Sequence, residues 1–236
     1  MKPTAATAKP AVAIAISGGI DSLVAAHRLR QAGHPIIGLH FISGFEPWIP
    51  AGEAASPTSA VLAMAGERLT PIEAQLQAPI EVVDLRRVFR EQVVDYFTQS
   101  YAAGLTPNPC LVCNPAIKFG QLLARARDIG APLLATGHYA RIRHPESPSP
   151  QLLRGMDPTK DQSYFLARLT SEQLARARFP LGDLTKADTR RIAADAGLQA
   201  LTEKESQDIC FIQEGAYSDF LSKRPGFTPQ PGPVVN

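Results

Sequence analysis

The feature that most constrains the fold is the apolar run Val12–Ile16, which leads through the loop "SGGIDS" directly into a helical pattern. A short apolar run that ends at glycines is typical of a buried parallel strand. Leu23, Ala26 and Leu29 then share one face of a helix that Gly33 ends. The chain therefore begins with a strand, a glycine loop and a helix.

The alternation of strand and helix continues through residue 142. The pattern predicts strands over 35–41, 79–85 and 132–138, helices over 88–102 and 116–129, a long loop over 43–60, and an irregular, proline-rich loop over 104–115. Such an order is typical of a parallel sheet with helices on both faces. The loops that begin at Ser17, Ser43 and Gly137 then share the carboxyl edge of the sheet, where α/β proteins bind ligands.

Residues 143–222 have a different pattern, which predicts a small helical extension that carries Cys210. We expect an exposed turn over 143–150, a short strand over 152–155, and helices over 162–169, 171–177 and 185–196. Ser171, three residues before Leu174, and Thr185, three residues before Asp188, stand at the starts of the last two helices, and the second pair is the better cap. Residues 1–10 are expected to be a disordered tail, 11–142 a nucleotide-binding domain, and 223–236 a proline-rich tail or linker.

Composition narrows the protein class only in part. The formal net charge is +2, which neither indicates nor excludes a nucleic-acid partner. The first apolar run is too short for a signal peptide, and no stretch approaches the roughly 20 apolar residues that span a membrane. Three cysteines, an odd number, argue against a disulfide framework and favour a reducing cytoplasm.

The glycine loop favours an anion bound at a helix N-terminus. It lacks the lysine of a Walker A loop and the glycine spacing of a dinucleotide fingerprint. Backbone N–H groups, the hydroxyls of Ser17 and Ser22, and the helix dipole suit a released pyrophosphate. Asp21 would repel a phosphate unless it bonds loop amides or reaches Mg²⁺. The alternative is a tight turn whose serine and aspartate only cap the helix.

The three cysteines form a second candidate site. Cys110 and Cys113 have the Cys-x-x-Cys spacing beside Asn108, and Cys210 lies far downstream in "SQDICFI". A cysteine pair in an irregular loop is typical of metal binding or redox chemistry. The alternative is that these are small buried side chains, and for Cys210 alone both interpretations stay open.

Longer strings carry a family resemblance. "SGGIDS" resembles the PP-loop of the ATP pyrophosphatase superfamily, whose members adenylate an oxygen and then replace it. "TPNPCLVCNPAIKFGQLL", "ATGHYAR", "LLRGMDPTKDQSYFL", "FPLGDLTKADTRRIAADAGL" and "ICFI" are similar, in the same order, to the tRNA-specific 2-thiouridylases. The resemblance spans residues 12 to 222 and is weakest over 42–78.

This resemblance implies a Rossmann-like fold and a tRNA-uridine 2-sulfurtransferase. ATP, with Mg²⁺, would adenylate the C2 oxygen of the wobble uridine, and sulfur would then replace it, releasing AMP and pyrophosphate. The implied ATP-binding residues are Ala15, Ile16, Ser17, Gly18, Gly19, Ile20, Asp21, Ser22, Phe41 and Gly137. The implied tRNA-binding residues are Asn108, Pro109, Cys110, Lys160, Asp161 and Gln162. Lys118 is expected either to offset phosphate charge or to be a solvated helix lysine, and His138 either to contact ATP or to have a structural role.

The resemblance also implies a sulfur path. Cys113 and Cys210 match the two working cysteines of the family, one of which carries a persulfide. Many family members have Asp at the position of Cys110. With three cysteines at one site, we hypothesise a [4Fe–4S] cluster held by Cys110, Cys113 and Cys210, with the persulfide route as the alternative. The sulfur donor is expected to be sulfide, a cysteine desulfurase or a sulfur-relay protein.

Two other functions stay open. A PP-loop enzyme can adenylate a different tRNA position or a small metabolite, and a chain without tRNA chemistry can carry sulfur or an iron–sulfur cluster. The family continues past "GPVVN" into further domains that help to hold tRNA. We therefore expect either a truncated sequence or a short relative that binds tRNA with less surface or with a partner.

Overall fold

A five-stranded parallel sheet forms the centre of the computed structural model, which describes residues 9–49, 57–143, 149–201, 209–212, 217–224 and 227. Its strand order is β3-β2-β1-β4-β7. The strands are β1 (Val12–Ala15), β2 (Ile36–Ile42), β3 (Ile80–Asp84), β4 (Leu133–Ala135) and β7 (Ala177–Arg178). The predicted α/β class with a parallel sheet is confirmed, and β7 is a strand that the sequence pattern did not predict.

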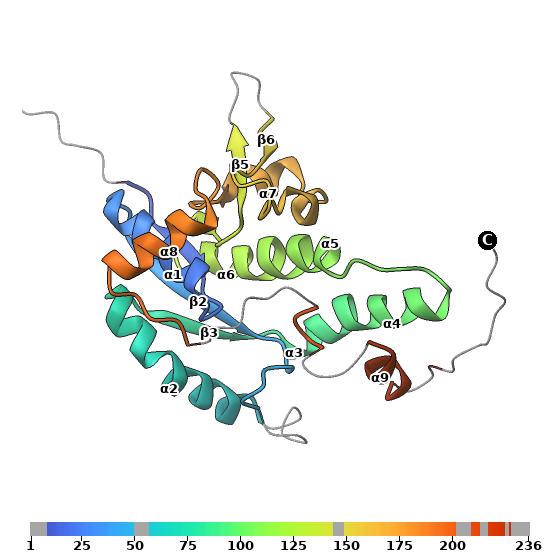
Figure 1. Cartoon of the computed structure of the whole chain (residues 1–236). Coiled ribbons are helices and arrows are strands. Elements are labelled where there is room, and N and C mark those ends of the chain that lie inside the picture. Colours follow the sequence, from blue (N-terminus) through green and yellow to red (C-terminus); the bar gives the residue numbers. More distant parts are fainter. Residues whose placement is uncertain are drawn as a thin grey trace, which may run out of the picture.

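Helices cover both faces of this sheet (Figure 1). Val12 and Ile14 of β1 pack toward one set of helices, and Ala13 packs toward the other, as the alternation of side chains along a strand requires. The first set is α1 (Ile20–Gln31), α2 (Thr58–Leu76) and α8 (Lys186–Asp195). The second set is α3 (Arg86–Phe89), the π-helix η2 (Arg90–Val94), α4 (Asp95–Ala102), α5 (Cys110–Cys113), the π-helix η3 (Asn114–Leu122) and α6 (Leu123–Asp128).

The chain after β4 forms a smaller, mostly helical part that packs onto the same two cores. Its elements are the antiparallel pair β5 (Ala140–Arg143) and β6 (Gln151–Arg154), the 3₁₀-helix η4 (Ser163–Leu166), α7 (Ser171–Arg176) and α9 (Tyr217–Ser222). Thr185 caps α8 in a capping box with Asp188, as predicted. The prediction for α7 is wrong by one residue: Thr170, whose backbone is extended, forms the capping box with Gln173.

Helix α2 was missed by the sequence analysis. Helix α2 begins at Thr58, inside the predicted loop over 43–60, and residues 50–56 lie outside the described part of the chain. The signal was available, because the buried residues of α2 recur every three or four positions, at Val61, Ala65, Leu69, Ile72 and Leu76. The surrounding prolines, glycines and alanines hid it, and Pro71 lies inside the helix.

The prediction that residues 104–115 are irregular is wrong at its C-terminal end. A helix begins at Cys110 and runs through η3 and α6 without a break. The side chain of Asn108 accepts a hydrogen bond from the Cys110 N–H at 3.1 Å, and Pro109 is at the N-cap, where its missing N–H costs nothing. Cys110 and Cys113 therefore lie on the first helical turn and not in a loop.

Several expectations fall on residues that the structure does not describe. These are most of the N-terminal tail (1–8), the centre of the predicted turn (144–148) and most of the C-terminal tail (225–226 and 228–236). The proposed division at residues 142 and 222 stays a prediction. In the part of the chain that is described, no helix has both the length and the apolar character needed to cross a membrane.

Candidate active site at the carboxyl edge of the sheet

The glycine loop opens helix α1 without a side-chain cap. Gly19 is the N-cap and has no side chain to cap the helix, and its own N–H donates to Ser17 Oγ at 3.3 Å. Ser22 Oγ donates to the Gly19 carbonyl at 2.8 Å and accepts from the Ser17 N–H at 3.3 Å. Gly18 has φ +81°, which favours glycine. Because neither serine nor Asp21 caps the helix, its N-terminus keeps the donors that an anion can use.

Asp21 forms an ion pair that the sequence analysis missed. Its carboxylate oxygens lie 2.7 and 2.9 Å from Lys186 Nζ at the start of α8, and the Tyr139 hydroxyl donates to it at 2.9 Å. A cation and a hydroxyl therefore offset the charge of Asp21, which is a solution other than the loop amides or Mg²⁺ considered from the sequence. Lys186 supplies a cation beside a loop that lacks the Walker lysine. Little in the sequence indicated this role, because Lys186 is the first residue of a capped helix and a lysine at such a position is ordinarily solvated.

Gly137, at the end of β4, lies against the start of α1. A Cβ at Gly137 would come within 2.9 Å of the Asp21 carbonyl carbon and 3.0 Å of the Ser22 nitrogen. The position therefore requires glycine because two backbones meet there. Phe41, predicted to lie near the nucleoside, is half-buried on β2, with its ring centroid 6.3 Å from that of Phe89.

His138 connects this loop region to the helix of the cysteines. Its Nε2 lies 3.4 Å from Lys118 Nζ, and its Nδ1 lies 2.6 Å from Thr136 Oγ1. An ammonium group can only donate, so Nε2 accepts and Nδ1 carries the proton. Burial, and then the charge of Lys118, lower the pKa of His138 well below 6.5, and the imidazole is therefore neutral.

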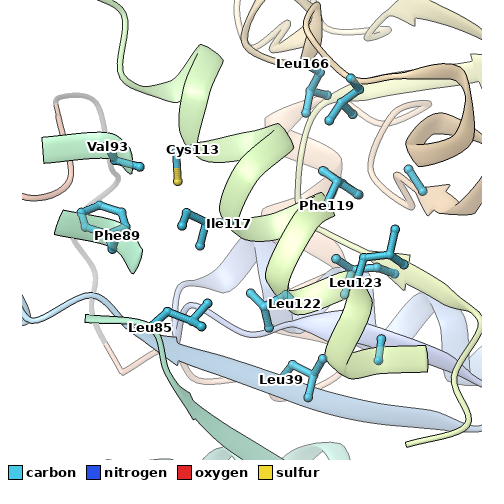
Figure 2. Packing of buried hydrophobic residues seen from close by; sticks show 14 of the residues in the cluster. Leu39, Leu85, Phe89, Val93, Cys113, Ile117, Phe119, Leu122, Leu123 and Leu166 are labelled. Atoms are coloured by element: carbon cyan, nitrogen blue, oxygen red, sulfur yellow. The ribbon is translucent and has the colours of Figure 1, made fainter. Parts of the chain in front are cut away.

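Cys113 lies in the hydrophobic core and not at an open surface. It is 9% exposed, and Figure 2 shows its sulfur beside Phe89, Val93 and Ile117. Burial raises the pKa of the Cys113 thiol to about 12, although the charge of Lys118 opposes this change. The thiol is therefore protonated at neutral pH in this arrangement.

The three cysteines come together in the fold. Phe211 anchors the segment 209–212 in the core, with its ring centroid 5.8 Å from Phe89 and 5.3 Å from Phe97. This brings Cys210 beside the cysteine helix, which is the continuous helix of α5, η3 and α6 over residues 110–128. Cys210 and Cys110 both raise the pKa of Cys113. Cys110 is half-buried and Cys210 is exposed as a residue. For both, burial of the thiol is the largest cause of a raised pKa, and the Lys118 charge opposes it.

The described side chains do not form a ready metal site. Among them, no group of three His, Cys, Asp or Glu side chains is arranged to hold a metal ion. A cluster ligand must be a thiolate, whereas the pKa of each of the three thiols is raised. The [4Fe–4S] hypothesis stays a prediction, and we derive no chemical step through a cluster.

The residues predicted to contact tRNA have structural bonds of their own. Asp161 accepts hydrogen bonds from the backbone N–H groups of Gly155 (2.9 Å) and Ser163 (3.1 Å), and it pairs with Arg154. The Gln162 side-chain oxygen accepts from the Tyr139 N–H, and the backbone N–H of Gln162 donates to the Tyr139 carbonyl. Asp161 and Gln162 therefore shape the segment around Lys160.

Asn114, the residue after Cys113, is a buried polar residue that was not singled out from the sequence. Its side-chain nitrogen donates to the Phe165 carbonyl at 2.8 Å. Its Oδ1 is buried and has no hydrogen-bond partner among the described residues. A buried acceptor without a donor is uncommon in folded proteins, and this one follows Cys113 directly.

The neutral state of His138 predicts a specific pH dependence of stability. The unfolded chain gains a proton on this residue below about pH 6.5, and the folded chain does not, so the free energy of unfolding falls by up to about 1.4 kcal/mol per pH unit as the pH drops. His138→Gln should remove this part of the slope in urea unfolding between pH 7.5 and 5, and His27→Gln on α1 is the matched control. An unchanged slope in His138→Gln would contradict the assignment.

A comparison with known protein families identifies the family to which the chain belongs. A family model described as "tRNA methyl transferase HUP domain" matches residues 10–214, a range that contains the glycine loop and all three cysteines. The chain belongs to this family.

Curated relatives of this HUP domain chain carry the name "tRNA-specific 2-thiouridylase MnmA". The protein from Desulfosudis oleivorans is 45% identical over 97% of this chain and 59% of its own length. The proteins from Roseiflexus castenholzii and Moorella thermoacetica are each 43% identical, over 95% and 94% of this chain and 64% and 62% of their own lengths. The chain thus spans about 60% of the length of these relatives.

Proposed function

We propose that this chain carries the ATP-using and sulfur-transferring centre of a tRNA 2-thiouridine synthase. One observation carries the proposal: the end of β4 joins the two halves of the site. Gly137 touches the uncapped start of α1, and the next residue, His138, bonds Lys118 on the cysteine helix. The proposed anion site and the cysteine helix therefore both contact the carboxyl end of β4, the kind of edge where α/β proteins bind ligands. The names of the curated relatives support the same activity.

In the ATP half, residues Ala15 to Ser22 hold the phosphates. The N–H groups at the start of α1 face the anion, and the helix dipole favours it. Pairing with Lys186 offsets the charge of Asp21, which would otherwise repel a phosphate. Mg²⁺ accompanies the ATP. The C2 oxygen of uridine attacks the α-phosphate, pyrophosphate leaves, and the adenylated oxygen becomes a leaving group.

In the sulfur half, Cys210 and Cys113 act in sequence. The terminal sulfur of a Cys210 persulfide attacks C2, and AMP leaves. The Cys113 thiolate attacks the remaining sulfur of Cys210, which leaves a Cys113–Cys210 disulfide and 2-thiouridine, so a thiol reductant is needed for the next turnover. Cys113 must lose its proton for this step, and Lys118 is the cation whose charge favours the thiolate.

The base and the tRNA backbone meet two further segments in this proposal. Asn108, Pro109 and Cys110 lie at the start of the cysteine helix and approach the target base. Lys160, in the segment that Asp161 and Gln162 shape, contacts the tRNA. The partners are tRNA and a sulfur donor. For the persulfide route the donor is a cysteine desulfurase or a sulfur-relay protein, which delivers sulfur already at the persulfide oxidation level, and sulfide is the donor for the cluster route. The reaction takes place in the cytoplasm.

The cluster hypothesis has its own test. The purified chain is reconstituted anaerobically with iron and sulfide, and visible absorbance and bound iron are measured for wild type and Cys110→Ala. A bound cluster that Cys110→Ala loses, together with its activity, supports ligation by Cys110, Cys113 and Cys210. Full activity of Cys110→Ala without absorbance supports the persulfide route.

The activity itself is tested with ATP and unmodified tRNA under anaerobic conditions. A cysteine desulfurase with cysteine supplies persulfide sulfur, and a thiol reductant is present for turnover. We expect 2-thiouridine by nucleoside mass spectrometry and pyrophosphate release that depends on added tRNA. Release stimulated by a small metabolite would instead favour a different acceptor, and no ATP turnover would favour a sulfur or cluster carrier. A methyl group on the nucleoside, which the family description names, would contradict the proposal.

A further inference from the structure

The cysteine helix opens into a π-helix directly after Cys113. Residues Asn114–Leu122 form η3, in which hydrogen bonds join residues five positions apart. Pro115 lies at the start of this segment, and a proline removes an α-helical hydrogen bond and crowds the carbonyl four residues before it. Gly120 fits the wider turn, because a Cβ there would lie 2.8 Å from the Pro115 carbonyl oxygen.

One side chain from another element holds this turn. The Gln173 side-chain nitrogen donates to the Pro115 carbonyl at 2.8 Å and to the Phe119 carbonyl at 3.1 Å. Its side-chain oxygen accepts from the Thr170 N–H at 3.0 Å, so the cap of α7 fixes the direction of the amide. Gln173 therefore joins two carbonyls of η3 from outside the helix.

The wider turn changes which residues share a face. In an α-helix, a residue five positions later lies about 140° away around the axis. In a π-helix the hydrogen bond joins these two residues, so they lie nearly in line. Cys113 precedes η3, and Lys118 is five residues later. The π-turn thus brings Lys118 onto the face of Cys113, where its ammonium also reaches His138 Nε2 at 3.4 Å.

We propose that Gln173 is a positioning residue that holds the η3 turn open and so keeps Lys118 between Cys113 and His138. It touches no reacting atom and acts through two backbone carbonyls. The consequence for catalysis rests on the proposed function, in which Lys118 favours the Cys113 thiolate. The placement of Lys118 does not depend on that function.

The test uses His138 as a spectroscopic reporter in the full chain. The ring nitrogens are observed by ¹⁵N NMR at pH 7.5, where His138 is neutral. Lys118→Met removes the ammonium that donates to His138 Nε2, and its spectrum shows where the Nε2 resonance lies without that hydrogen bond. Gln173→Met, which is similar in length and uncharged, should move the Nε2 resonance most of the way to that value. Thr170→Ala loosens the same cap but keeps the Gln173 amide, and it should retain the wild-type resonance.

The kinetic readout separates positioning from general damage. Gln173→Met should lower kcat for 2-thiouridine on the order of 10- to 100-fold, the effect of a misplaced catalytic group, and leave KM for ATP unchanged. A wild-type His138 resonance in folded Gln173→Met overturns the proposal, as does an equal shift in Thr170→Ala. If tRNA thiolation is not the activity, the kinetic signal is absent in wild type, whereas the NMR result still decides the placement of Lys118.

Discussion

Replacing Cys113 by alanine is expected to abolish 2-thiouridine formation and to leave tRNA-dependent pyrophosphate release intact. In the proposed function, adenylation needs the glycine loop and the base, whereas release of sulfur needs the thiolate of Cys113. The loss should be at least about 1000-fold, as for other residues that make or break bonds. Nucleoside mass spectrometry and pyrophosphate release, measured on the same samples, separate the two steps.

Cys113→Ser is the second variant of this experiment. Serine keeps the size of the side chain but places a hydroxyl among Phe89, Val93 and Ile117, which costs about 1–3 kcal/mol if the hydroxyl finds no partner. Alanine avoids that cost. If both variants release pyrophosphate and neither makes 2-thiouridine, folding damage is excluded as the cause. Formation of 2-thiouridine by Cys113→Ala would contradict the proposed sulfur path.

Replacing Asp21 by asparagine is expected to lower the free energy of unfolding by about 3 kcal/mol, the lower end for breaking a buried ion pair. The Lys186 side chain is 9% exposed, and the variant leaves its ammonium without the carboxylate. Lys186→Met should lower the free energy of unfolding by less, because the Asp21 side chain is 35% exposed and water can hydrate its carboxylate. Urea unfolding at pH 7.5 measures both values.

The double variant Asp21→Asn, Lys186→Met completes the cycle. It also removes the buried ammonium that has lost its carboxylate, so its free energy of unfolding should recover most of the loss seen in Asp21→Asn. An apolar side chain of similar volume often replaces a buried charge at little cost. If the two single losses simply add, the pair has no interaction energy, and the role of Lys186 in offsetting the charge of Asp21 is wrong.

Local sequence patterns predicted the features that depend on neighbouring residues. The apolar run before the glycine loop predicted β1, and the periodic leucines predicted α1. Thr185 and Asp188 predicted the start of α8. These predictions succeed because strand alternation, helix periodicity and capping are interactions over a few residues. The strings around the cysteines also supported a family that the comparison confirms.

The remaining site features come from contacts between distant segments. Lys186 meets Asp21 across 165 positions, and Gln173 reaches the Pro115 carbonyl across 58. The helical start at Cys110 was mistaken for a loop because three prolines were counted without their positions in the turn. A proline count carries no information on whether each missing N–H was needed.

The sequence alone was sufficient to predict the strand–loop–helix unit, the parallel sheet and the set of three cysteines, because each of these depends on local periodicity or residue type. The tertiary structure alone placed the Cys113 thiol in an apolar core, aligned Lys118 with it through a π-turn, and paired Asp21 with Lys186. Burial and charge at a point in space depend on every segment that packs there, and no spacing along one segment contains that information.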